Sequence, residues 1–366
     1  MKRKGAPDSL LILATFVLLA IGLVMVYSSS SVNSLYLYGI SYYYLRRQFI
    51  FVVLGLAAMF VCMNFNYWQW RRFVKLFFFI NFILLGLVLI PGIGVARTDA
   101  QRWIDLGFMR FQPSDFTKFA LVLFTANYLV VKREMIQQFR RGLLPVLLIT
   151  GLNFGLIMLQ PDLGTGLAIV GSIVVMLFGA GVNVWHLIGL AAAAIPGIVA
   201  LIWIAPYRLM RLLIFTDPWR DPTQHGWQII QSLLAIGSGG FAGVGLGASR
   251  QKYLYLPEPW NDFIFAIICE EMGFIGGATV ILLFLILIWR GFRIAMNAPD
   301  SFGQFLALGL TAIIAVQASI NIGVVTGSLP VTGINLPLIS YGGSSLLITL
   351  GCIGILLNIS RYSMNG

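Results

Sequence analysis

Residues 9–28 read SLLILATFVLLAIGLVMVYS, a stretch that contains no charged side chain. A membrane-spanning helix needs roughly 20 mainly apolar residues, so this stretch is long enough to cross a bilayer. We expect it not to be a cleaved signal peptide, because its apolar run is long and the four serines at 28–31 offer no clear small-x-small cleavage site. The stretch therefore predicts the first helix of an integral membrane protein.

The composition of the whole chain supports the same conclusion. Of its 366 residues, 59% are hydrophobic and only 10% are charged, and the mean hydropathy is +0.89. Soluble domains are nearer half apolar and a quarter charged, so a disordered chain, a fibrous rod and a water-soluble enzyme are excluded. Cys62, Cys269 and Cys352 lie inside apolar runs, so we expect neither a secreted-type disulfide framework nor a zinc site.

Apolar segments recur about ten times, most of them near the length that a membrane helix needs. They lie near residues 9–28, 46–63, 73–90, 113–131, 143–158, 164–181, 186–204, 263–289, 303–326 and 342–360. The sequence predicts an all-α polytopic membrane protein of one domain, residues 1–366, with a large extracellular loop at 205–262 between the seventh and eighth helices. An even number of spans puts both termini on one side, and the Lys and Arg density of the short loops favours cytoplasmic termini.

The net charge of +11 points to an anionic partner. The chain has no soluble basic domain for nucleic acid, so membrane phospholipids and anionic lipid-linked substrates are expected instead. With cytoplasmic termini, the outer face is unusually basic, which is typical of an anion-binding surface. We predict that substrate-binding groups are among the outer residues Arg102, Arg208, Arg211, Arg250 and Lys252.

One charged cluster opens a predicted helix with Gln112-Pro113-Ser114-Asp115 and continues to Lys118. Asp115 and Lys118 are three residues apart and therefore share one helix face. Charged side chains inside a membrane usually pair with each other or line a cavity. The two residues therefore form either a self-neutralised pair or a polar wall of a substrate cavity.

A second cluster lies where the large loop enters the eighth predicted helix, at residues 257–262. Asp262 is either a helix cap, a position that favours Asp, or a carboxylate that faces a cleft, and the two roles are compatible. Glu270 and Glu271 lie about 12–13 Å further along the helix, at 1.5 Å per residue. One of these glutamates is a candidate partner for Lys118 across a helix interface.

Three further segments carry weaker signals. Residues 237–247 hold six glycines and form either a loop packed near the membrane or a cradle of backbone N–H groups for phosphate. The segment 227–236 has helical periodicity and predicts an amphipathic helix on the outer leaflet. The turn at 160–165 suits its Pro, Asp and Gly residues, and its Asp162 is a candidate for orienting substrate or binding a metal.

Five motifs occur in order along the chain: AQRWI (100–104), QPSD (112–115), QPDLGTG (160–166), YLPEPWNDFIFA (255–266) and SYGGSS (340–345). In this order they resemble the SEDS family of shape, elongation, division and sporulation proteins, over essentially the whole chain. The resemblance is closest to the FtsW/SpoVE branch, through Pro206-Tyr207-Arg208 and residues 249–252, and RodA is the sister alternative.

The resemblance implies a peptidoglycan glycosyltransferase for cell division or sporulation. It would polymerise lipid II, a lipid-linked disaccharide-peptide, into polyprenyl-linked glycan at the outer face of the bacterial cytoplasmic membrane. A class B penicillin-binding protein would be its partner and would crosslink the product. The essential aspartate of the family maps onto Asp262, although Trp260-Asn261 precede it where many relatives have Thr directly before the Asp. Asp115 stands where Glu is common in the family, and it keeps the charge.

Asp262 is the predicted catalytic base, because a carboxylate can take the proton of an attacking sugar hydroxyl. The departing pyrophosphate gathers negative charge, which the outer Arg and Lys residues and a divalent cation such as Mg²⁺ or Mn²⁺ can stabilise. Asp115, Lys118 and Asp162 are expected to line the substrate cavity. One-step displacement needs no covalent intermediate, in agreement with the lack of a recognisable nucleophile motif.

Two other classes of function fit the composition equally well. A lipid II flippase would need a polar path that reaches the cytoplasmic side, whereas a catalytic group belongs at the outer mouth. A non-catalytic scaffold for a penicillin-binding protein would tolerate the loss of Asp262. Only the resemblance favours the enzyme over these alternatives.

Overall fold

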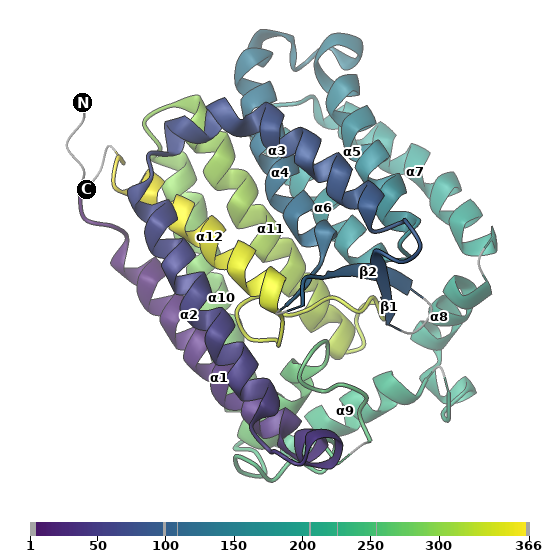
Figure 1. The fold of residues 1–366 in the computed structure, drawn as a ribbon. Helices are drawn as coiled ribbons and strands as arrows, with labels where there is room; N and C mark the ends of the chain where they lie inside the picture. Colours follow the sequence, from purple (N-terminus) through teal and green to yellow (C-terminus); the bar gives the residue numbers. More distant parts are fainter. Residues whose placement is uncertain are drawn as a thin grey trace.

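The computed structural model describes residues 5–97, 100–107, 109–204, 206–224, 226–253 and 255–363. These residues form a helical bundle with one small sheet (Figure 1). The α-helices are α1 (Ser9–Tyr38), α2 (Tyr43–Asn64), α3 (Tyr67–Leu87), α4 (Pro113–Val131), α5 (Leu144–Met158), α6 (Leu163–Gly179), α7 (Val184–Ile204), α8 (Pro206–Thr216), α9 (Trp227–Gly239), α10 (Ile264–Met296), α11 (Ser301–Val325) and α12 (Gly343–Ser360). Short helical turns cover Arg133–Met135, Phe139–Leu143 and Pro218–Arg220.

The predicted membrane segments coincide with helices α1 to α7 and α10 to α12, so the all-α polytopic prediction is confirmed. Within the described residues, seven helices are long and apolar enough to cross a membrane, and α6 and the first part of α7 are shorter apolar helices. Helix α3 carries the basic residues Arg71, Arg72 and Lys75 in its first half, and they lower its hydropathy. The extracellular position of 205–262 stays a prediction.

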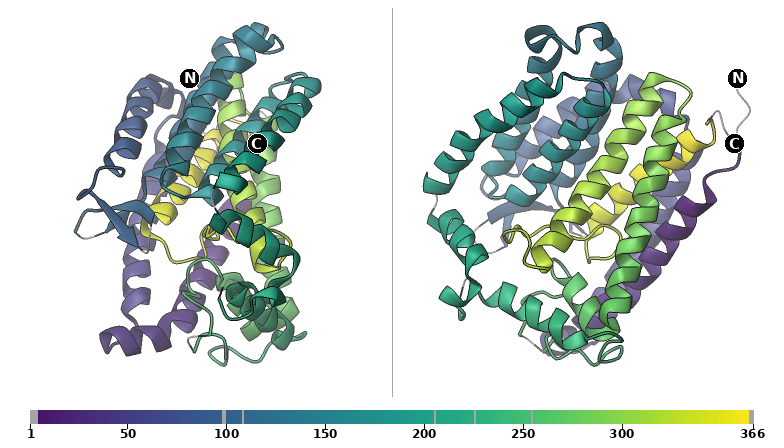
Figure 2. Two further views of the ribbon diagram at one scale, coloured as in Figure 1. Left: turned by 90° about the vertical axis from the view of Figure 1, so that its right-hand side faces the viewer. Right: turned by 180° about the vertical axis from the view of Figure 1, so that it is seen from behind.

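Helices α11 and α12 lie at the centre of the bundle, with α1 and α2 on one side and α3 to α7 on the other (Figures 1 and 2). Helix α12 packs closely along α2, where a Cβ on Gly354 would come within 2.4 Å of the Met59 carbonyl oxygen. Small residues let membrane helices approach in this way. Helix α11 packs against α4, α6 and α10, and so contacts the elements that carry the charged clusters.

The two termini meet at one end of the bundle (Figure 1). The Gly5 backbone N–H donates to the Arg361 carbonyl at 2.8 Å. Asp8 caps α1 through the Leu11 N–H and pairs with the guanidinium of Arg290 from α10. Both termini therefore lie on the same side, as an even number of spans requires.

A three-stranded antiparallel sheet lies between α3 and α4 and was not predicted from the sequence. Its strands are β1 (Gly94–Arg97), β2 (Ala100–Asp105) and β3 (Arg110–Phe111), in the order β1-β2-β3. The pairing shifts between Val95 and Ala96, as in a β-bulge. These strands are too short to produce a clear alternation of apolar and polar residues.

Helix α10 turns back on itself at Gly273, whose φ of 66° and ψ of −162° are not helical. A Cβ on Gly277 would lie 2.8 Å from Cys269 Sγ and 3.6 Å from Phe265 Cζ. Residues 265 and 277 would be about 18 Å apart along a straight helix. The segment 264–272 therefore folds against the following part of the helix, whereas the sequence predicts one continuous span.

The glycine-rich loop 239–247 supplies the hydrogen bonds that this turn removes from α10. The N–H groups of Val244 and Gly245 donate to the carbonyls of Glu270 and Glu271, both at 3.0 Å, and the Phe274 N–H donates to the Gly240 carbonyl at 2.9 Å. Broken helices in membranes need such substitutes. Of the two interpretations of this loop, close packing is the one that the structure contains, because these N–H groups face protein carbonyls.

Candidate functional site

Asp262 lies at the last turn before α10 and is half-buried. Helix α10 begins at Ile264, with Phe263 in the capping position and no side-chain cap. Asp262 is therefore not the residue that caps this helix. Its carbonyl accepts a hydrogen bond from Asn321 Nδ2 at 2.8 Å, and its Oδ2 lies 3.4 Å from the position of a Cβ on Gly333. The candidate base is thus held between α10, α11 and the segment that precedes α12.

Aromatic side chains from distant parts of the chain form one border of this region. The ring of Trp260 lies 4.6 Å from that of Tyr44, and Tyr44 meets Tyr341 edge-on at 5.2 Å. The Tyr341 N–H donates to the Trp260 carbonyl at 2.9 Å. Burial raises the pKa of Tyr341, although the Arg47 guanidinium opposes this shift, so its hydroxyl remains a neutral donor at pH 7.

Several buried polar atoms in the segments around Asp262 have no hydrogen-bond partner among the described residues. Nearly all buried polar groups in proteins are hydrogen-bonded, either to protein or to bound molecules. Sugar hydroxyls can donate and accept, so they are suitable partners for a mixed group of this kind. The atoms are Trp260 Nε1, Asn261 Oδ1, Asn321 Oδ1 and Thr332 Oγ1.

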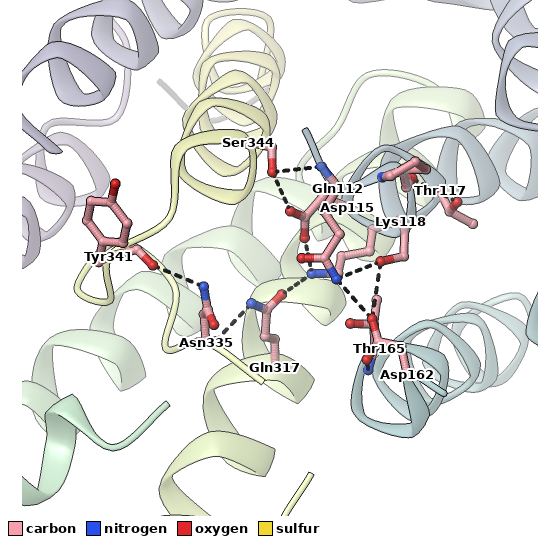
Figure 3. A network of polar contacts seen from close by, with 12 residues as sticks. Gln112, Asp115, Thr117, Lys118, Asp162, Thr165, Gln317, Asn335, Tyr341 and Ser344 are labelled. Atoms are coloured by element: carbon pink, nitrogen blue, oxygen red, sulfur yellow. Dashed lines mark hydrogen bonds and ion pairs between the residues drawn. The ribbon is translucent and has the colours of Figure 1, made fainter. Parts of the chain in front are cut away.

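Asp115 and Lys118 form a buried ion pair at the start of α4 (Figure 3). Lys118 Nζ lies 2.9 Å from Asp115 Oδ1 and donates to Gln317 Oε1, also at 2.9 Å. Asp115 Oδ2 accepts from the Ser344 hydroxyl at 2.9 Å. The pair therefore joins α4 to α11 and α12, and the expectation that Lys118 pairs with Glu270 or Glu271 is wrong, because these glutamates bind other groups.

The network continues from Asp115 to Asp162 at the start of α6 (Figure 3). Gln112 Nε2 donates to Asp162 Oδ2 at 2.9 Å, and the Ser114 hydroxyl does so at 3.3 Å. Asp162 Oδ1 accepts from the Thr165 N–H at 3.2 Å and so caps α6. With 1% of its surface exposed, Asp162 acts in this structure as a buried cap.

In the opposite direction the network reaches the segment before α12. Gln317 Nε2 donates to the Asn335 carbonyl at 2.9 Å, and Asn335 Nδ2 donates to the Tyr341 carbonyl at 3.2 Å (Figure 3). The Ser340 hydroxyl donates to the Asn261 carbonyl at 2.6 Å. The buried ion pair is therefore connected, through side chains and backbone, to the segment that carries Asp262.

Two of the predicted basic residues have protein partners. Arg102, on β2, donates through Nε to the Gln160 carbonyl at 2.9 Å and through Nη2 to the Pro161 carbonyl. Lys252 is buried, with Nζ 3.2 Å from Glu271 Oε1 and a second hydrogen bond to the Gly247 carbonyl. A contact between Lys252 and substrate would require this ion pair to open.

Arg211 and Arg250 have exposed side chains, as a substrate-binding role requires. Arg211 Nη1 donates to the Val331 carbonyl at 3.2 Å, two residues before Gly333. Arg211 and Val331 line a cavity of about 290 Å³, together with residues of α8 and α9 and Pro257. Arg208 lies in α8, but its side chain is outside the described residues.

Among the described residues, no three His, Cys, Asp or Glu side chains gather closely enough to hold a metal ion. A divalent cation at Asp262 would take its other ligands from groups such as carbonyls, waters or phosphate oxygens. The expected use of Mg²⁺ or Mn²⁺ stays a prediction.

Gln317 and Asn321, which help to hold the site together, were not singled out from the sequence, and Ser344 was noted only as part of the SYGGSS motif (340–345). Gln317 and Asn321 are four residues apart on α11 and so lie on one helix face, inside a mainly apolar segment. Polar side chains in membrane helices tend to hydrogen-bond across helices. This pair of amides was therefore a signal that sequence reasoning could have used.

Comparisons with known proteins cover nearly the whole chain. Residues 8–365 match the model of the cell cycle protein family that groups FtsW, RodA and SpoVE. The chain is 52% identical to stage V sporulation protein E of Bacillus subtilis (strain 168), over 99% of both proteins. It is 46% identical to the probable peptidoglycan glycosyltransferase FtsW of Trichlorobacter lovleyi, over 98% of this chain and 94% of the relative.

Solved structures share the fold. A chain from a peptidoglycan synthase complex, studied for the coordination of polymerization and crosslinking, superposes with a TM-score of 0.80 at 31% identity. The rod shape determining protein RodA of Thermus thermophilus gives a TM-score of 0.72 at 28% identity. Each comparison covers 99% of both chains.

Proposed function

The chain belongs to the FtsW/RodA/SpoVE family of cell cycle proteins, and we propose that it is a peptidoglycan glycosyltransferase that polymerises lipid II in cell division or sporulation. The observation that carries this proposal is the position of Asp262. Its carboxylate lies beside segments with unfilled buried hydrogen-bonding groups, and a basic cavity adjoins the same segment before α12. A base, a polar surface for sugars and a cation for the leaving group are thereby close together.

The reaction is a direct displacement at an anomeric carbon. A sugar hydroxyl forms the new glycosidic bond while Asp262 takes its proton. The bond from the anomeric carbon to the polyprenyl pyrophosphate breaks, and the leaving group departs with the electron pair. Arg211 and Arg250 are the described basic residues with exposed side chains that are suited to stabilise this charge. Any Mg²⁺ or Mn²⁺ would add charge stabilisation at the pyrophosphate.

The outer face of the bacterial cytoplasmic membrane is the proposed place of the reaction. The shared side of the two termini would then be cytoplasmic, as the basic short loops favour. The opposite end carries Asp262, α8, α9 and the loop that covers the turn in α10. Lipid tails would stay in the bilayer while the headgroups react there.

A class B penicillin-binding protein is the proposed partner that crosslinks the product. The support is the similarity, at 31% identity, to a chain of a complex whose subject is polymerization and crosslinking. A polymerase that makes uncrosslinked strands requires such a second activity for a finished wall.

The space around the charged pair in α4 argues against the flippase alternative. The cavity beside Asp115 and Lys118 has a volume of about 10 Å³, enough for one water molecule. A disaccharide headgroup needs a far larger space, so this pair does not line a headgroup path in this conformation.

The direct test supplies purified protein with lipid II in a defined detergent and follows glycan strands by gel electrophoresis. A parallel experiment reconstitutes the protein in vesicles and follows the movement of lipid II between leaflets. We expect glycan product in the first experiment. Transfer between leaflets without any product would replace the enzyme by the flippase, and the absence of both would favour the scaffold.

A further inference from the structure

Asn321 is a buried amide in the last third of α11, with 1% of its surface exposed. Its Nδ2 donates to two backbone carbonyls, those of Asp262 at 2.8 Å and Ile334 at 2.7 Å. An amide nitrogen has two donors and a carbonyl oxygen can only accept. The orientation of the Asn321 amide is therefore fixed by its partners, and both of its donors are used.

The segment that Asn321 holds has no regular structure of its own. Residues 331–336 belong to neither a helix nor a strand, so their backbone groups need other partners. Asn321 binds the carbonyl of Ile334, and Gln317, one helical turn earlier, binds that of Asn335 at 2.9 Å. One face of α11 thus fixes two consecutive carbonyls of this segment.

Gly333 in the same segment faces the carboxylate of Asp262. Asn321 therefore ties together the backbone of Asp262 and the segment that borders its side chain. These two pieces of chain are otherwise connected through Ser340 and Tyr341, which bind the carbonyls of Asn261 and Trp260. Asn321 makes its contact at Asp262 itself.

We propose that Asn321 is a positioning residue that sets the place of the Asp262 carboxylate relative to the reacting sugars. This inference rests on the proposed function. Reactions between bound groups depend steeply on alignment, and a displacement of about 1 Å can cost about 100-fold in rate. Loss of the amide would leave two buried carbonyls without a donor and would release the segment around Gly333.

The test compares Asn321→Leu and Asn321→Asp with the wild-type protein in the lipid II polymerisation assay. Leu fills a similar volume without donors, and Asp has almost the same shape but offers acceptors to the two carbonyls. We expect kcat per folded molecule to fall about 100-fold in both variants. In Asn321→Asp, which keeps an oxygen at the Oδ1 position, the KM for lipid II should change less than about threefold, because an error in alignment acts on the chemical step.

Asn358 on α12 provides a matched control at the other end of the bundle. It is also fully buried, with Nδ2 2.7 Å from the Met63 carbonyl and Oδ1 accepting from the Tyr67 N–H at 2.9 Å. Asn358→Leu should lower the thermal unfolding midpoint about as much as Asn321→Leu. Its kcat per folded molecule should stay within about twofold of wild type, since it lies far from the reacting groups.

The outcomes separate this inference from the proposed function. If wild-type protein makes no glycan, the proposed function fails first. If wild-type protein is active and Asp262→Asn is inactive, but Asn321→Asp and Asn321→Leu keep normal kcat, the positioning role is wrong and the function stands. Equal losses of kcat in Asn321→Leu and Asn358→Leu would also overturn it, because a general loss of packing would then explain both. A selective loss at Asn321 supports the inference.

Discussion

Asp115 and Asp262 stand at opposite ends of one hydrogen-bonded region but differ in their surroundings. Both carboxylate oxygens of Asp115 have partners, Lys118 Nζ and the Ser344 hydroxyl. Around Asp262, by contrast, buried atoms of Trp260, Asn261 and other nearby residues lack a partner among the described residues. A saturated buried network stabilises one arrangement of helices, whereas unfilled capacity suits a place where a ligand completes the hydrogen bonds. The difference favours the first region as structural support and the second as the proposed reacting site.

Removing the charge at Lys118 should have the largest effect on stability. Lys118→Met leaves Asp115 as an uncompensated buried charge, which typically costs about 3–5 kcal/mol. Thermal and denaturant unfolding of the purified protein would measure this loss.

The double variant Asp115→Asn with Lys118→Met serves as the control, because it removes both charges. It should recover much of the lost stability. If Lys118→Met is as stable as wild type, the hydrogen-bonded network around Asp115 does not stabilise the packing of the helices.

Lys252, the second buried lysine, allows a similar test with a smaller expected loss of stability. Lys252→Met leaves Glu271, which still accepts from the Ser28 hydroxyl at 2.7 Å and the Ser249 N–H at 3.3 Å. We expect a loss of about 3 kcal/mol, at the lower end for a broken buried pair, measured by the same unfolding experiments. If Lys252→Met loses more free energy of unfolding than Lys118→Met, the remaining partners of Glu271 do not compensate for its charge as expected.

The turn in α10 can be tested at Gly273. A side chain there meets both a φ of 66° and the Gly243 nitrogen, 2.3 Å from the Cβ position. Gly273→Ala should therefore destabilise the protein by about 1–3 kcal/mol. Gly151→Ala on α5 is the control, because no atom lies within 4 Å of its Cβ position. Equal stability of the two variants would argue for a continuous α10.

The basic cavity should contribute to binding rather than to stability. Arg211→Gln should weaken lipid II binding about tenfold, or about 1.4 kcal/mol, with the unfolding midpoint unchanged. Arg220→Gln removes an exposed charge from a residue that does not line this cavity, and binding should be unaltered. If the two variants bind lipid II equally well, the cavity is not the pyrophosphate site.

Local patterns were sufficient to predict the long helices and the pairing of Asp115 with Lys118, since three residues on one helix fix that contact. They could not reveal Gln317, which lies 199 residues further along the chain. Apart from Glu270, Glu271 and Thr279 the run 263–289 is apolar, and its pattern is long enough for one continuous helix, so it did not indicate the turn at Gly273. Lys252 looked like an outer cation because its partner Glu271, 19 residues further along the chain, was expected deep inside a continuous span.

Asp262→Asn is the sharpest test of Asp262 as the catalytic base, because Asn keeps the size of the side chain and removes the carboxylate. The measurement is the rate of glycan formation from lipid II per folded molecule, with thermal unfolding recorded on the same sample. We expect a fall of about 10²–10⁴-fold, the usual contribution of a general base. The unfolding midpoint should change little, since Asp262 does not cap α10 and Asn keeps the size of the side chain. A polymerisation rate within a few-fold of wild type would contradict the assignment of Asp262 as the catalytic base.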